Sequence, residues 1–189
     1  MMLAHSATDP NDHDRDRQTP LWLAVGHQSE RIVRALLGHR RISPDFPTSN
    51  GSTPLCRAAN LGNAEIVKLL LEHKDVDPNT RDGDGGTPLS WAVNHRNNPM
   101  VQQLLGHKAI DPNLPTSDGN TPLCTAANLG DVEIVMLLLA REQVDPNTRD
   151  GDGKIVRLLL GQLGVIPILE IVMAEHHSSR PWIIGMIPW

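Results

Sequence analysis

Four histidines recur at a fixed interval and are the residues most capable of binding a metal. His5, His39, His73 and His107 lie 34 residues apart, and imidazole is a common zinc ligand at about 2 Å from the ion. A fixed interval of this length is typical of stacked structural repeats, whose layers lie about 10 Å apart. Histidines in separate layers cannot share one ion. We therefore expect them to pack near the end of a helix or to act there as cations.

Two cysteines and two Asp-Gly-Asp-Gly segments carry weaker chemical signals. Cys56 and Cys124 lie two intervals apart, which predicts a Cα separation of about 20 Å, against a limit of about 7 Å for a disulfide. The segments at 82–85 and 150–153 lack the spacing and closing glutamate of an EF-hand calcium loop, so they predict turns. Phosphate-binding loops, zinc signatures and nucleophile elbows are also missing from the sequence. We expect no enzyme, no metal site and no cofactor.

Composition excludes further classes of function. The 189 residues carry a net charge of −5 and a pI near 5.9, which gives no basic surface for nucleic acid or anionic lipid. The longest nearly apolar run, residues 163–173, is interrupted by glycine, proline and glutamate and is too short to cross a membrane. No signal peptide is visible at the N-terminus. The expected location is cytoplasmic or nuclear, with no membrane and no nucleic acid as partner.

A 34-residue repeat organises the chain and must position any functional side chain. Thr-Pro-Leu begins at Thr19, Thr53, Thr87 and Thr121. A hydrophobic pair ending in valine follows each threonine by 13 and 14 residues, and a proline follows it by 25 residues. Four copies in one register predict a solenoid of stacked units.

Each unit is predicted to be a helical hairpin followed by a projecting loop. Thr53 is a candidate helix N-cap, and Pro54 falls at the first helical position, where proline needs no N–H partner. Gly62 suits the left-handed residue that ends this helix, and Asn63 suits the N-cap of a second helix. Neither short helix can bury its apolar face alone, so neighbouring units must stack.

The pattern resembles the ankyrin repeat in its Thr-Pro-Leu triplet, Ala-Ala pair, glycine and Val-x-x-Leu-Leu run. The resemblance implies an all-α ankyrin-repeat solenoid of stacked helical hairpins with projecting loops. Full repeats are expected at 19–52, 53–86, 87–120 and 121–153. The third departs most, because Arg96 replaces the glycine and Pro99 enters the second helix. We expect that repeat to be the least stable, since a residue other than glycine is strained at positive φ.

Both ends of the array are predicted to be incomplete. Residues 1–18 match the end of a second helix and its loop, and residues 154–164 match a repeat that lacks its first helix. Uncapped ends expose apolar faces, so marginal stability or self-association is expected.

The tail at 165–189 no longer follows the repeat and is interpreted as a frame-shifted repeat. In the alternative frame Met173-Ala174 forces a glycine, and permitted codons restore a Thr-Pro-Leu beginning at position 176. That threonine would lie 21 residues after Ile155, the same distance that separates Ile66 from Thr87. A genuine but divergent C-terminal cap is the alternative.

The resemblance implies binding to another protein through the concave surface of the first helices and the tips of the loops. Trp22 and Trp91 both fall on first helices, where an aromatic side chain either anchors a partner or covers the core. Register places these candidate partner-binding residues on that surface: Arg57, Asn60, Arg81, Asp82, Asp84, Trp91, Asn94, His95, Ser117, Asp118 and Asn128. The alternative is a fragment or remnant of a larger multi-domain protein with no independent activity.

Overall fold

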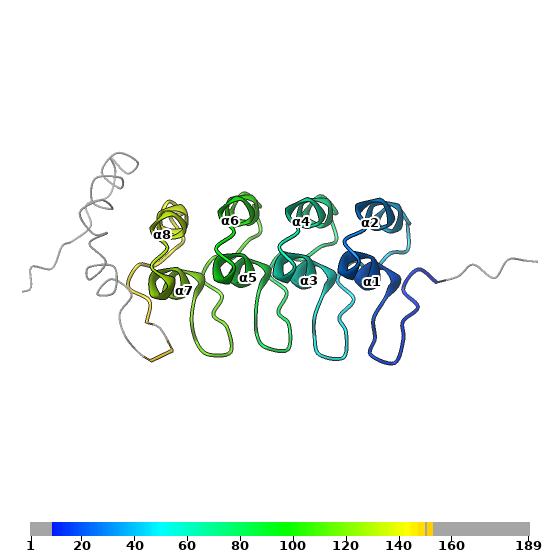
Figure 1. Ribbon diagram of the computed structural model, residues 1–189, viewed down its shortest axis with the longest axis horizontal. Helices are drawn as coiled ribbons and strands as arrows, with labels where there is room; N and C mark the ends of the chain where they lie inside the picture. Colours follow the sequence, from blue (N-terminus) through cyan, green and yellow to red (C-terminus); the bar gives the residue numbers. More distant parts are fainter. Residues whose placement is uncertain (1–8, 150, 153–189) are drawn as a thin grey trace, which may run out of the picture.

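The computed structural model describes residues 9–149 and 151–152, which form eight α-helices in two rows (Figure 1). The first row comprises α1 (Pro20–Gly26), α3 (Pro54–Asn60), α5 (Pro88–Asn94) and α7 (Pro122–Leu129). The second row comprises α2 (Glu30–Leu37), α4 (Ala64–Leu71), α6 (Asn98–Leu105) and α8 (Val132–Leu139). Successive loops project beyond the first row, on the side away from the second (Figure 1). This confirms the predicted all-α repeat solenoid. The predicted partial repeats and the tail lie wholly or partly outside the described residues.

The Thr-Pro pair starts every helix of the first row in the same way. The threonine side chain accepts a hydrogen bond from the backbone N–H three residues on, for example at 3.2 Å from Cys56 to Thr53. Proline follows at the first helical position in α1, α3, α5 and α7. The predicted caps are therefore confirmed.

The second row is capped less evenly. Asn63, Asn97 and Asp131 each accept a hydrogen bond from the backbone N–H three residues on. Ser29 stands at the same place before α2 and makes no such side-chain bond. The helix α2 therefore begins without the stabilisation of about 1 kcal/mol that a side-chain cap supplies.

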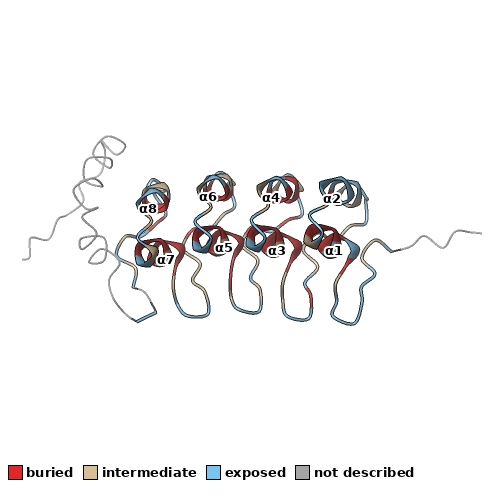
Figure 2. Ribbon diagram, viewed as in Figure 1, coloured by how far each residue is buried: buried red, intermediate tan, exposed pale blue. Residues whose placement is uncertain are grey.

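The core runs between the two rows as one continuous apolar layer (Figure 2). Leu70, Leu104 and Leu138 occupy one repeat position and are fully buried, whereas the equivalent Leu36 is only half-buried. Val33 is the single buried residue of α2, against four such residues in α4. Helices of seven or eight residues do not persist alone in water, so each depends on the layers beside it.

The turn between the two helices of a repeat uses one left-handed residue. Gly62 and Gly130 have φ of +75° and +67° there, while Gln28 and Arg96 adopt φ of +52° and +53°. The predicted strain at Arg96 is thus present, but the first repeat shares it at Gln28. Both side chains also bond the next repeat: the Arg96 guanidinium donates to Leu129 O at 2.6 Å, and Gln28 Oε1 accepts from Asn63 Nδ2 at a longer 3.3 Å. Because α2 also lacks a side-chain cap and buries only Val33, we revise the predicted order and expect the first repeat to be the least stable.

A row of asparagines joins each loop to the next. Asn79 donates to Ala109 O and accepts from Asp111 N, both at 2.7 Å. Asn11 and Asn113 donate in the same way to the loop that follows each of them, at 2.7 and 2.8 Å. These bonds fix one loop against its neighbour along the array.

Asp45 interrupts this row of asparagines. One carboxylate oxygen accepts from Asp77 N at 2.6 Å, and the other is buried without a partner. Burial raises the pKa of Asp45 to about 6, with further contributions from the Asp77 and Asp75 carboxylates, while its hydrogen bond and nearby His73 oppose that rise. A protonated Asp45 can donate where asparagine donates, so this junction favours the neutral acid.

The recurring histidines make the same backbone hydrogen bond in successive repeats. The Nδ1 atoms of His39, His73 and His107 each accept from the backbone N–H two residues on, at 3.3 Å. Each imidazole thus packs against the backbone of the turn that follows its second helix. Within residues 9–149 and 151–152, no group of three metal-ligating side chains occurs. Position 5 lies outside the described residues.

The remaining chemical candidates also have structural places. Cys56 and Cys124 are buried free thiols, as expected of core residues. None of the helices in the described part of the chain is long and apolar enough to span a membrane.

Candidate partner-binding surface

The surface between the first row of helices and the projecting loops carries the candidate residues. Leu23, Arg57, Trp91 and Thr125 each lie four residues after the repeat threonine and form one line across it. A second line follows three residues later, where Gly26 is succeeded by Asn60, Asn94 and Asn128. We call this area the concave surface.

Trp91 and Asp82 are joined across two successive repeats. The indole Nε1–H of Trp91 donates to Asp82 Oδ2 at 2.6 Å. The other carboxylate oxygen of Asp82 accepts from Asp84 N at 3.1 Å and from Gly86 N at 2.7 Å. One carboxylate thus holds the loop closed and fixes the tryptophan, so both residues shape the surface before any partner arrives.

His95 adds a second link from the Trp91 repeat to the preceding repeat. Its ring stacks on Trp91 with the centroids 5.9 Å apart, and its Nε2 lies 3.1 Å from Asn60 Oδ1. The structure therefore brings together four residues that register alone placed on the same surface: Asn60, Asp82, Trp91 and His95. Their mutual contacts were not visible in the sequence.

The loop tips pack on one another through backbone contacts. Ser117 Oγ donates to Asp84 O at 2.6 Å, which links two successive loops. A side chain at Gly83 would collide with Asn50 O of the preceding loop, so only glycine allows this close approach. The Asp84 and Asp118 carboxylates remain exposed along this edge.

Three further candidate side chains are exposed and have unused hydrogen-bonding groups. Arg81, Asn94 and Asn128 make no side-chain hydrogen bond to any residue that the structure describes. They differ in this from Asn60 and Asp82. Polar groups with free donors and acceptors on a supported surface are suited to contact a partner.

Arg57 lies flat on Trp22 of the preceding repeat. Its Cζ is 3.7 Å from the indole ring centroid, within the range of a cation–π interaction. Partial burial lowers the pKa of Arg57. Its Nε–H and the Nε1–H of Trp22 are both buried without an acceptor. Trp22 was considered as an anchor or as core cover, and at 9% exposure it belongs to the core.

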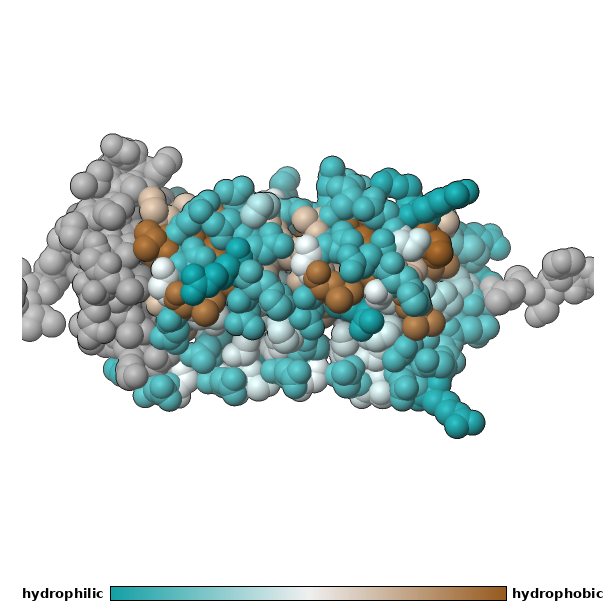
Figure 3. Space-filling model, viewed as in Figure 1, coloured by the Kyte–Doolittle hydropathy of each residue, from teal (hydrophilic) through white to brown (hydrophobic). Residues whose placement is uncertain are grey.

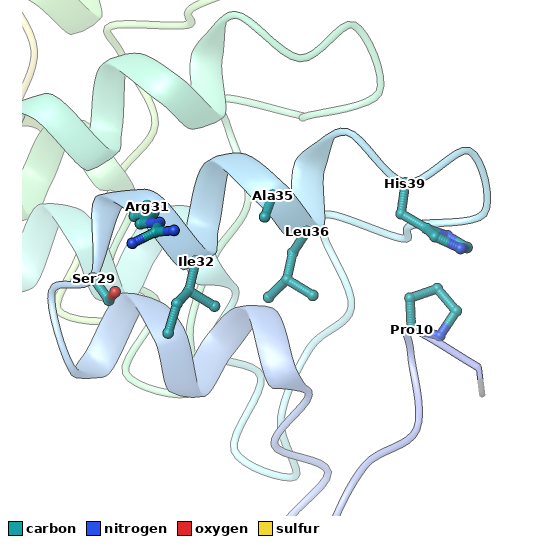
Figure 4. Close-up of a pocket in the computed structure, with 7 residues that line it drawn as sticks. All are labelled: Pro10, Ser29, Arg31, Ile32, Ala35, Leu36 and His39. Atoms are coloured by element: carbon teal, nitrogen blue, oxygen red, sulfur yellow. The ribbon is translucent and has the colours of Figure 1, made fainter.

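Sequence reasoning missed an open hollow against α2. It has a volume of about 540 Å³ and is lined chiefly by Ile32, Ala35 and Leu36, with Pro10 at its end (Figure 4). Ile32 is 52% exposed, the highest value among the large apolar side chains described. Hydropathy also marks apolar patches among the helices, whereas the loop edge is hydrophilic or near neutral (Figure 3). The prediction that an uncapped end exposes apolar side chains could have located this hollow.

Comparison with known proteins agrees with this architecture. A family model described as ankyrin repeats, in three copies, matches residues 1–82 and 74–150. The crystal structure of EF0377, described as an ankyrin repeat protein, aligns with a TM-score of 0.76 and 26% identity. That alignment covers 88% of this chain and 85% of EF0377. No curated protein matches the sequence.

Proposed function

Because this chain belongs to the ankyrin-repeat family, we propose that it binds a protein partner through its concave surface and loop tips. Ankyrin repeats are generally protein-interaction modules, and enzymatic activity is not typical of them. The observation that best supports the proposal here is the cluster of Asn60, Asp82, Trp91 and His95, which links neighbouring repeats.

Preorganisation is the physical reason why this cluster favours binding. Immobilising a flexible side chain on association costs about 0.5–1.5 kcal/mol. Trp91 is already held at both its indole N–H and its ring face, so a partner meets a fixed aromatic edge. Asn94 and Asn128 then supply free amides on the second line of the surface.

The candidate residues divide by role under this proposal. Asn60, Asp82, Trp91 and His95 form the supported platform, whereas Arg81, Asp84, Asn94, Asp118 and Asn128 make polar contacts to the partner. Ser117 fixes the Asp84 loop, and Arg57 has a separate role argued below.

Site-specific crosslinking identifies the partner and tests the surface together. A photoreactive amino acid at Asn94 is expected to capture a specific protein from cell extract, while the same group at Lys68 on α4 does not. Lys68 is exposed on the second row and serves as the control. Equal capture at both positions would contradict a concave binding site.

Affinity for the captured protein gives the quantitative test. Alanine at Trp91, Asn94 and Asp84 together is expected to weaken binding by at least tenfold, because interface anchors and polar contacts are lost. Asn94→Ala with Asn128→Ala is expected to weaken it without disturbing the platform. Unchanged affinity in both variants would rule out this surface.

A second proposal is that the chain is a fragment or remnant of a larger multi-domain ankyrin protein. The open hollow against α2 supports it, since a further repeat would cover Ile32 and Leu36. A longer reading frame in the genomic DNA would establish it, and absence of transcript would indicate a remnant. Self-association through the ends, tested by sedimentation, and a cytoplasmic or nuclear location, tested with a fluorescent tag, remain parts of the first proposal.

A further inference from the structure

Two buried N–H donors without acceptors meet where the first and second repeats join. They are the Nε1–H of Trp22 and the Nε–H of Arg57, and the guanidinium of Arg57 covers the indole of Trp22 at 3.7 Å. Buried donors in native proteins are almost always satisfied by protein, water or ligand. Trp91 shows the usual outcome, since its indole N–H is bonded to Asp82.

Arg57 is a cation without a counter-ion. Its side chain makes no hydrogen bond and no ion pair with any residue in the described ranges 9–149 and 151–152, and partial burial lowers its pKa. The Asp82 carboxylate is already bonded to Trp91, Asp84 and Gly86 and is not available to it. A guanidinium removed in part from water, and left unpaired, gains most from an anion supplied by another molecule.

The local sequence makes room for this guanidinium. Gly26 stands where the later repeats carry Asn60, Asn94 and Asn128, and a Cβ at position 26 would lie 2.6 Å from Arg57 Nη2. Only the first repeat therefore lets an arginine lie across the end of its first helix. The indole on one side and Gly26 beneath it restrict the fork that Arg57 presents.

Two exposed leucines share the surface with Arg57. Leu23 holds the equivalent repeat position on α1 and is 39% exposed. Leu61 follows Arg57 by four residues, on the same helical face, and is 41% exposed. The charge of Arg57 is thus accompanied by an apolar side chain in each of the two repeats.

We propose that Arg57 recognises a carboxylate side chain of the protein partner, with Leu23 and Leu61 contacting apolar residues beside it. The proposal rests on the concave surface being the binding site. The planar guanidinium matches a carboxylate by paired N–H···O bonds, here through the Nη groups, which make no hydrogen bond to any described residue. Because the chain carries a net charge of −5, it gives an acidic partner no long-range attraction, so the contact acts through slow dissociation.

Selection from a random peptide library on the full chain tests the carboxylate preference. Peptides selected on the wild type are expected to share an aspartate or glutamate, and those selected on Arg57→Met are not. Lys68→Met removes a cation from the opposite row and should retain the acidic preference. The same peptides on wild type and Arg57→Met, or a pool that binds better when the acid is replaced by phosphoserine, would overturn the proposal.

A double-mutant cycle then measures the pairing itself. Glutamate to glutamine in the selected peptide is expected to weaken binding about tenfold on the wild type and less than twofold on Arg57→Met. Equal losses on both proteins overturn the proposal. Peptides affected by Asn94→Ala and Asn128→Ala but not by Arg57→Met would refute only the carboxylate site. Insensitivity to all three would refute the concave surface as a whole.

An NMR titration of the wild-type protein tests the contact without a peptide library and without a variant that could misfold. The Arg57 Nε–H resonance is expected to shift saturably with acetyl-Leu-Glu-Leu-amide and not with the matched glutamine peptide. No shift with either peptide overturns the proposal. If Arg57→Met loses native tryptophan circular dichroism, Arg57→Lys replaces it in the cycle, and an unchanged glutamate effect there would contradict recognition by the guanidinium fork.

Discussion

The junction between repeats 19–52 and 53–86 differs from the junction between 53–86 and 87–120, although the backbone repeats. At the later junction, Asn79 bonds the next loop with both ends of its amide, and His95 contacts Asn60. At the earlier one, buried polar atoms of Trp22, Asp45 and Arg57 lack partners, whereas the repeat 87–120 contains one such atom, Asn98 Oδ1. The two junctions therefore share a backbone arrangement but differ in stability, because an unsatisfied buried group costs about 1–3 kcal/mol.

The largest expected effect on stability comes from the difference in burial between the first and second repeats. Leu70 is fully buried and Leu36 only half-buried at the same repeat position. Leu70→Ala is expected to destabilise the fold by about 2–5 kcal/mol, and Leu36→Ala by about 1 kcal/mol or less. Urea unfolding followed by circular dichroism measures both. Equal losses would show that the first repeat is packed as tightly as the second.

Removing the Asp82 carboxylate tests how much its hydrogen bonds to Trp91 and to the loop stabilise the fold. Asp82→Ala leaves the Trp91 indole and two loop N–H groups without their acceptor, so a loss of about 1–3 kcal/mol is expected. Asp14→Ala is the matched control, because Asp14 accepts two loop N–H bonds and no indole. A smaller urea shift for Asp82→Ala than for Asp14→Ala would contradict the role of Trp91.

Asp45→Asn should repair the earlier junction. Asparagine can donate where the buried carboxylate oxygen has no partner, which is expected to stabilise the protein by about 1 kcal/mol at pH 7. The folded pKa of Asp45 is raised from 3.8 to about 6, so the penalty of its charge is complete above pH 6. It fades as the pH falls from 6 towards 3.8.

The advantage of Asp45→Asn over the wild type should therefore shrink across that pH range. Thermal melting of both proteins at pH 7.0 and at pH 4.5 measures the difference. An advantage that stays constant with pH would show that Asp45 is charged in the fold throughout.

The smallest effect concerns the left-handed turn. Gln28→Gly relieves strain at φ +52° and loses only the long 3.3 Å bond from Asn63, so a gain of at most about 0.5 kcal/mol is expected after the entropic cost of glycine is deducted. Arg96→Gly relieves similar strain but loses the bond to Leu129 O, so no gain is expected. Chemical denaturation compares the two. A larger gain for Arg96→Gly would return the third repeat to the place of the weakest.

Local signals account for what could be predicted from the sequence. The Thr-Pro pair, the glycine at position 62 and the cap at Asn63 act within a few residues, and the structure confirms each. The solenoid follows from them, because short helices with one apolar face have to stack.

Contacts between repeats could be identified only in the structure. The hydrogen bond from Trp91 to Asp82 spans a loop, and Arg57 meets Trp22 from another repeat, so helical periodicity reveals neither. Register did contain one overlooked clue. Asp45 stands where Asn11, Asn79, Asn113 and Asn147 stand, and a lone acid in a row of amides marks a missing donor.

The stacking of short helices also determines how the array responds to a mechanical load. Each layer is held by its immediate neighbours, so tension applied at the two ends is carried in series and the weakest junction yields first. Release of one 34-residue repeat adds about 120 Å of contour length at roughly 3.6 Å per residue. With its unsatisfied junction and sparsely buried α2, the first repeat is the one expected to peel away, leaving the Trp91 cluster intact under tension.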